Sequence, residues 1–287
     1  MIGILFALLA LFAWSIGDFS IQRAVRVFGD FKTLLYIGII GVVALLPFVY
    51  SEIAPLFFST RGLLILSLAG VVIFFAALFD FEALKRGKLS VIEPILAIEL
   101  PVTIALSILF WGESMSALQY LLAGTTFVGI LLIVTARNRA DSKRIWEKGV
   151  ILAGVGSIIM GLVNFLVGVS SQTTSPLLTI WYTNLIFSFL CFIYLVLKKD
   201  LVSIPRDIRE KPRELLMVGI FDNAAWIFFA FATFYIPISL ATTISESYVA
   251  VAALLGIWIN KEKLQRHQFF GIAITILSVL LLSYISE

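Results

Sequence analysis

The sequence has very little with which to build a disulfide framework or a metal centre. Its 287 residues include one cysteine, Cys191, and one histidine, His267. A lone cysteine cannot form an internal disulfide, and a structural zinc site usually needs four Cys or His ligands. His267 lies in the polar stretch KEKLQRHQ, where a solvated or interfacial imidazole is expected rather than a metal ligand. We therefore expect no metal site and no cofactor.

Charged residues are also scarce. They make up 14% of the chain, whereas 61% of the residues are hydrophobic and the mean hydropathy is +1.06. An ordinary soluble domain is about 25% charged and about 45–50% apolar, so the composition predicts an integral membrane protein embedded in a lipid bilayer. A net charge of +3 does not indicate a nucleic-acid partner, because the basic residues gather at the ends of apolar runs, as membrane topology requires.

Sequence motifs that are typical of enzymes are absent as well. The chain contains no GxGxxG, Walker GxxxxGK[ST], HExxH or GxSxG segment, each of which sets reactive or phosphate-binding groups at a fixed spacing. Its acidic residues do not form the Asp-rich metal motif that a membrane prenyltransferase would be expected to carry. We therefore expect a protein that is not an enzyme.

Apolar runs long enough to cross a bilayer core of about 30 Å need about 20 residues each. The sequence contains ten such runs, and they predict an all-α integral membrane fold with ten transmembrane helices. They lie near residues 2–20, 31–50, 62–84, 90–110, 116–135, 148–168, 176–197, 214–236, 238–259 and 268–286.

Basic residues lie almost entirely at one set of connections between these runs. The odd-numbered connections hold 20 of the 21 Lys and Arg residues, and Arg61 is the one basic residue in the even-numbered connections. Short cytoplasmic loops of membrane proteins carry this kind of excess. The pattern predicts that the basic loops are cytoplasmic, that both termini lie outside, and that the protein resides in the plasma membrane.

The two halves of the sequence repeat one another. A shift of 149 residues aligns, without a gap, Gly70 with Gly219, Ala83 with Ala232, Ser90 with Ser239 and Glu113 with Glu262. We predict a five-helix repeat at residues 1–135, a cytoplasmic linker at 136–147, and a second five-helix repeat at 148–287. Because five is odd, the second repeat enters the membrane inverted, as in many secondary transporters.

These halves, together with Gly112-Glu113 at the end of the predicted fourth helix and a short helix directly after it, resemble a known group of proteins. The chain resembles the drug/metabolite transporter superfamily, in particular its EamA-like ten-helix members, over essentially its whole length. The resemblance implies a carrier of small polar or amphipathic metabolites. It also implies alternating access, with a cavity between the halves.

The segment SVIEPILAIELP, residues 90–101, carries two glutamates that we expect to differ in role. Ser90 and Glu93 have the spacing of a helix capping box, in which each side chain binds a backbone N–H group of the first turn. Glu99 lies nine residues beyond Ser90, about 13–14 Å along a helix and close to the bilayer centre. Pro101 cannot donate to the carbonyl of Ala97, and this predicts a kink beside Glu99.

Two further carboxylates lie at the same expected depth. Glu246 follows Pro237 by nine residues, and Asp222 follows Arg213 by nine. Asn223, Trp226 and the segment WYTN supply amide and aromatic groups, and aromatic faces can hold a cation. The predicted substrate or proton site comprises Glu99, Glu246, Asp222, Asn223, Trp226, Asn184, Trp181 and Tyr182. A packing role for each of these residues is the alternative.

The sequence thus predicts a secondary active transporter for small polar or amphipathic metabolites, such as amino acids or cationic and aromatic compounds. We expect an exporter that is coupled to protons and works as a monomer or a homodimer. A facilitative exchanger or an uptake carrier of the same superfamily is the first alternative. A membrane-embedded enzyme or a channel is the second.

Overall fold

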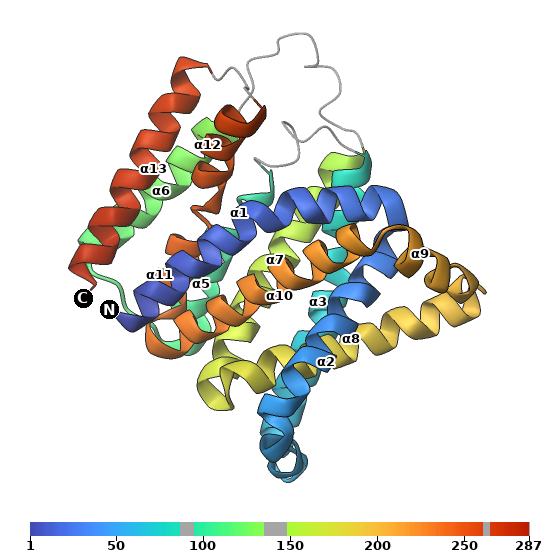
Figure 1. Ribbon diagram of the computed structural model, residues 1–287. Helices are drawn as coiled ribbons and strands as arrows, with labels where there is room; N and C mark the ends of the chain where they lie inside the picture. Colours follow the sequence, from blue (N-terminus) through green and yellow to red (C-terminus); the bar gives the residue numbers. More distant parts are fainter. Residues whose placement is uncertain (87–94, 135–147, 261–264, 287) are drawn as a thin grey trace.

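The computed structural model (Figure 1) describes residues 1–86, 95–134, 148–260 and 265–286, and every regular element in those residues is helical. The long helices are α1 (Ile2–Phe28), α2 (Asp30–Phe57), α3 (Thr60–Arg86), α6 (Ala117–Val134), α7 (Lys148–Thr173), α8 (Pro176–Leu197), α10 (Pro212–Tyr235) and α13 (Arg266–Ile285). The shorter elements are α5 (Glu99–Trp111), η2 (Leu201–Ser203), α9 (Ile204–Glu210), α11 (Ile238–Ser245) and α12 (Tyr248–Asn260).

The described helices are long and apolar enough for a protein that crosses a membrane several times. Eight of the described spans pass on length and composition, and nine do so if α1, which bends by 40° between Ile2–Gly17 and Phe19–Phe28, is one span. The predicted fourth helix falls partly on residues 87–94, outside the described residues, and its described part, α5, has 13 residues. The count of ten therefore stays a prediction.

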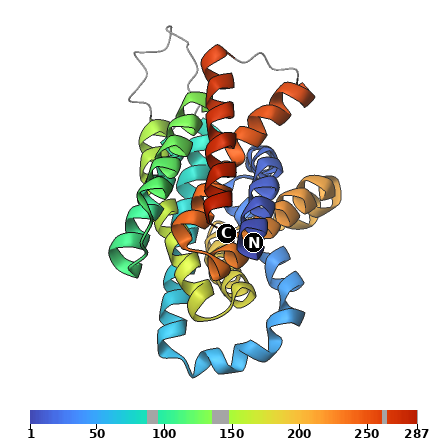
Figure 2. The same ribbon diagram turned by 90° about the vertical axis from the view of Figure 1, so that its left-hand side faces the viewer.

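Helices of the two halves pack against each other in antiparallel pairs. Along α2 and α8, Phe31 stacks on Tyr194 and the Trp181 indole donates to the Val42 carbonyl. Along α6 and α13, the Gln119 amide donates to Ser286 Oγ. Farther along this pair, the Gln268 amide donates to the Ile133 carbonyl, so the two helices run in opposite directions. Helices α1 and α10 are also antiparallel, because Gly3 lies against Tyr235 and Arg23 pairs with Glu214. Figures 1 and 2 show the two chain termini close together.

The predicted fourth and ninth helices are both interrupted. Pro101 predicts a kink in the fourth, whereas the ninth was expected to be a continuous span at 238–259. Residues 97–98 form a turn before α5, and residues 246–247 form a turn between α11 and α12. The two turns are 149 residues apart, which is the shift of the sequence repeat. Glu99 follows the first turn as the first residue of α5, and Glu246 lies within the second turn, two residues before α12 begins.

The two interruptions have different local causes. Pro101 lacks the N–H group that would bind the Ala97 carbonyl. The Ala97 carbonyl accepts a bond of 3.3 Å from the Leu100 amide instead. In the second half, the hydroxyls of Ser245 and Ser247 donate to the carbonyls of Ala241 and Ile244. Such side-chain bonds compete with the helix ladder and bend it.

Glycine permits the closest contact between α2 and its neighbours. A Cβ atom on Gly41 would collide with the side-chain amides of Asn184 and Asn223, whereas one on Gly124 would meet nothing within 4 Å. We expect Gly41→Ala to destabilise the protein by about 1–3 kcal/mol, because the buried amides cannot move away without losing their bonds. Gly124→Ala should be neutral or stabilising by up to about 1 kcal/mol. Thermal unfolding in detergent tests this, and equal unfolding midpoints for the two variants would contradict it.

Candidate functional site

An internal cavity of about 290 Å³ lies between helices of both halves. Its lining draws on the second half of α1, the start of α2, the second half of α3, the turn before α5 and the end of α6 from the N-terminal half. From the C-terminal half it draws on α7, α8, α10, the turn after α11 and α12. A site of this size suits a small organic molecule.

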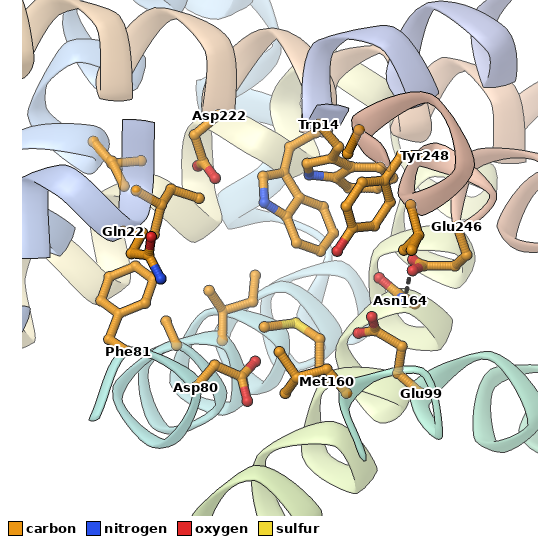
Figure 3. Close-up of a pocket in the computed structure, with 18 of the residues that line it drawn as sticks. Trp14, Gln22, Asp80, Phe81, Glu99, Met160, Asn164, Asp222, Glu246 and Tyr248 are labelled. Carbon is orange, nitrogen blue, oxygen red and sulfur yellow. Dashed lines mark hydrogen bonds between the residues drawn. The ribbon is translucent and has the colours of Figure 1, made fainter. Parts of the chain in front are cut away.

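One end of the cavity carries the two carboxylates of the interrupted helices. Figure 3 shows Glu99 and Glu246 close together, with Asn164 beside them. The Asn164 side-chain amide donates to Glu246 Oε1 at 3.4 Å, and Glu246 is only 6% exposed. Glu99 is the first residue of α5, where the backbone N–H groups favour negative charge, whereas Glu246 lies in the turn that ends α11. One end of the cavity therefore holds two acidic side chains and an amide inside an apolar protein.

The cavity also carries two aspartates, which come from α10 and α3. Asp222 of α10 and Asp80 of α3 face the same space, with Gln22 and Phe81 beside them (Figure 3). Asp80 is 9% exposed, and a Cβ atom on Gly156 would collide with its carboxylate, so α7 packs directly against this group. Four carboxylates therefore face one cavity.

Aromatic rings lie between Asp222 and Glu246. Trp14 of α1 meets Trp226 edge to face, with ring centres 5.3 Å apart, and lies 6.3 Å from the Tyr248 ring. In Figure 3, Trp14 and Tyr248 stand between Asp222 on one side and Glu246 on the other. Aromatic faces attract cations and stack on other rings. The wall between the carboxylates can therefore hold the apolar body of an amine.

The structure brings five of the predicted site residues into this lining. These are Glu99, Glu246, Asp222, Trp226 and Asn184. The described lining contains four carboxylates and no Lys or Arg, which gives the cavity the electrostatic character of a cation site. In the same described residues, no group of three His, Cys, Asp or Glu side chains is placed to hold a metal ion. Whether the five residues bind substrate stays a prediction.

Three other predicted site residues lie outside the cavity lining. The Trp181 indole points to α2 and donates to the Val42 carbonyl, and the Tyr182 hydroxyl hydrogen-bonds with Ser67 of α3. Asn223 accepts from Asn184 at 2.7 Å and donates to the Ile37 and Gly219 carbonyls. These bonds join α2, α8 and α10, so the contacts of the three side chains are those of packing residues. The predicted cap residues Ser90 and Glu93 lie outside the described residues.

Several lining residues were not among those predicted. Asp80, Gln22, Trp14, Tyr248 and Asn164 all line the cavity. Two signals were available in the sequence. Asn164 aligns with Asp18 when the first helices of the halves are compared at a shift of 146 residues, and Asp80 is an acidic residue inside a predicted membrane helix, which is a reason to expect function.

Interrupted helices beside an acidic and aromatic cavity, together with several membrane-length apolar helices, are typical of a multi-pass membrane transporter. The EamA-like transporter family matches residues 1–135 and, a second time, residues 147–284. The chain therefore belongs to the EamA-like transporter family, a group within the drug/metabolite transporter superfamily.

Comparison with known proteins adds information on the fold. No curated protein matches the chain. Among solved structures, one titled "Crystal structure of protein" superposes with a TM-score of 0.76 over 99% of this chain and 97% of its own. The two sequences are 12% identical, so this likeness concerns the fold alone.

Proposed function

We propose that this transporter is a secondary carrier of small cationic, amphipathic metabolites. The observation that carries the proposal is the cavity between the halves, whose described lining combines four carboxylates with the rings of Trp14, Trp226 and Tyr248. Carboxylates with aromatic rings between them fit an amine with an apolar body. Aromatic amines, quaternary amines and amino-acid-like cations are the substrate class.

We further propose that residues 1–135 and 148–287 are inverted repeats on either side of the linker 136–147. Support comes from pairs of helices that occupy equivalent places in the two repeats, α2 with α8 and α6 with α13, because both pairs are antiparallel. An axis along the membrane normal would make such pairs parallel, whereas an axis in the membrane plane makes them antiparallel. Inverted repeats are the usual basis of alternating access.

Proton coupling would arise at the Glu99–Glu246 end of the cavity. Both carboxylates line the cavity, and Glu246 also accepts a hydrogen bond from Asn164. A proton that neutralises one carboxylate and a cation that binds to it compete for the same negative charge. Competition at one site exchanges protons for substrate, so an inward proton gradient drives export of the cation.

Purified protein in liposomes with an imposed pH gradient tests this function. We expect saturable, gradient-driven flux of at least one aromatic or quaternary amine, and no saturable flux of neutral nucleobases. Saturable exchange that ignores the pH gradient would indicate a facilitative exchanger. Flux that does not saturate would indicate a channel, and a new product would indicate an enzyme.

The orientation of the chain is tested by two exposed positions in connections of opposite parity. Val202, in the seventh connection, is 87% exposed, and Phe58, in the second, is 91% exposed. Because basic loops face the cytoplasm, an impermeant thiol reagent added to intact cells should label Phe58→Cys and not Val202→Cys. The single native thiol, Cys191, is buried and gives little background. The opposite labelling pattern would place both termini in the cytoplasm.

A further inference from the structure

A glutamate outside the cavity joins the two halves of the protein. Glu113 follows α5 directly, after Gly112, whose φ of 71° ends that helix in the left-handed region. One oxygen of its carboxylate accepts from the backbone N–H of Ile238 at 2.5 Å, and the other accepts from that of Ser239 at 3.0 Å. The Ser239 hydroxyl also donates to the carboxylate. One side chain of the N-terminal half thus caps the start of α11 in the C-terminal half.

This contact fits the helix that it caps. The first N–H groups of a helix have no partner within the helix, and they attract negative charge. No side chain of its own caps the start of α11, since Pro237 occupies the N-cap position. Ile238 and Ser239 are completely buried, so separating the halves would expose their amides to a new environment. The hydrogen bonds of Glu113 are therefore strong, and they depend on the position of the C-terminal half relative to the N-terminal half.

The Glu113 contact lies at the end of the protein away from the cavity. Glu246, which lines the cavity, follows Ile238 by eight residues, a rise of about 12 Å along a helix. A second chain of hydrogen bonds joins the halves at the same end of α5. The Trp111 indole donates to Gln172 at 2.6 Å, and Gln172 donates to the Thr233 carbonyl at 2.7 Å. The cavity is lined by the second halves of α1 and α3 and by the last residues of α6, which lie away from Glu113.

We propose that the Glu113 carboxylate is a clasp that closes the cavity at the end of the protein where the chain termini lie, and that it releases α11 in each transport cycle. This inference rests on the alternating-access function proposed above. While the clasp is closed, the cavity can open only toward the opposite end. Release exposes the start of α11 and lets substrate pass on the clasp side.

A buried reporter thiol measures the opening directly. Thr242 lies one helical turn inside the clasp, is completely buried and differs from Cys by little in shape, so Thr242→Cys should react slowly with a polar thiol reagent in detergent. Glu113→Gln removes the charge and leaves one acceptor oxygen for three donors. Because hydrogen bonds to charged groups are the strong ones, we expect the labelling rate to rise about 10- to 150-fold.

Ser116→Ala is the matched control. Ser116 and Gln119 form a capping box at the start of α6, three residues beyond Glu113 but within one half. Losing this cap weakens the same connection without separating the halves, so the labelling rate should stay within about twofold of the unmodified clasp. Equal labelling rates in Glu113→Gln and Ser116→Ala would overturn the proposal.

A covalent crosslink across the clasp tests whether transport requires the clasp to open. Glu113→Cys combined with Ser239→Cys, joined by a short reducible crosslinker, should stop transport in liposomes while leaving substrate binding intact, and a reductant should restore transport. Transport that continues after complete crosslinking would overturn the clasp. If no cation is transported by any variant but the reporter thiol still responds to Glu113→Gln, the clasp stands and the carrier function fails.

Discussion

Replacing Glu246 or Glu99 by glutamine is expected to abolish transport driven by a pH gradient. Each substitution keeps the shape of the side chain and removes its charge and its ability to exchange a proton. In Glu246→Gln the amide of Asn164 can still donate to the remaining oxygen, so the helix break should persist and the protein should fold. Flux driven by the gradient should fall to the level of liposomes without protein. Substrate exchange without a gradient should survive in part.

The order of damage among the carboxylates distinguishes coupling from packing. We expect Glu99→Gln and Glu246→Gln to cost most, Asp222→Asn less and Glu93→Gln least, because glutamine also serves at the third position of a capping box. Adding Ser90→Ala to Glu93→Gln should cost about 0.5–2 kcal/mol of stability and little transport. If gradient-driven flux survives in both Glu99→Gln and Glu246→Gln while Glu93→Gln abolishes it, the roles are reversed.

The sequence was sufficient to predict helices in a membrane but not every break in them. Pro101 indicated the interruption beside Glu99, because a proline removes one helix bond wherever it stands. No proline marks the break at residues 246–247, where Ser245 and Ser247 bind carbonyls of the preceding turn. Thr183 makes the same kind of bonds inside α8 without breaking it. Serine and threonine therefore allow a break, and packing decides whether it forms.

The sequence predicted how deep in the membrane the candidate site residues lie, but not which way their side chains point around each helix. Counting residues from the ends of the apolar runs placed Glu99, Glu246 and Asp222 at one level, and the structure puts all three in one lining. Which way a side chain faces around its helix depends on the neighbouring helices. Trp181 and Tyr182 therefore contact α2 and α3, although the sequence suggested the cavity.

Asp80 was overlooked because of where its helix ends. The apolar run was expected to end near residue 84, which would put Asp80 close to the interface, among charges that solvent stabilises. Helix α3 continues to Arg86, and the carboxylate of Asp80 packs against Gly156 of α7 inside the protein. A membrane helix can extend beyond its apolar run, because the long side chains of Lys and Arg reach the interface from positions within the membrane. The ends of apolar runs therefore underestimate the depth of such residues.

Substitution of either aspartate is expected to weaken substrate binding more than it weakens the coupling to protons. Asp222→Asn and Asp80→Asn each remove one negative charge from the cavity and leave the Glu99–Glu246 pair unchanged. A hydrogen bond to a charged group contributes about 1.5–3 kcal/mol, so the apparent Kd for a cationic substrate should rise about 10- to 150-fold. A neutral analogue of the same shape should bind with unchanged affinity, because it does not use the charge.

Glu214→Gln provides the control for this prediction, since Glu214 lies on the same helix as Asp222 but pairs with the exposed Arg23 at the protein surface. An exposed pair contributes at most about 1 kcal/mol to stability, and its loss should leave the substrate Kd unchanged. Isothermal titration of detergent-solubilised protein measures all three variants with the cation and its neutral analogue. If Asp222→Asn and Asp80→Asn weaken the binding of both ligands equally, the aspartates shape the cavity, and its charge does not select the substrate. If Glu214→Gln weakens cation binding as much as Asp222→Asn does, the charge of the whole protein, and not the charge of the cavity lining, attracts the cation.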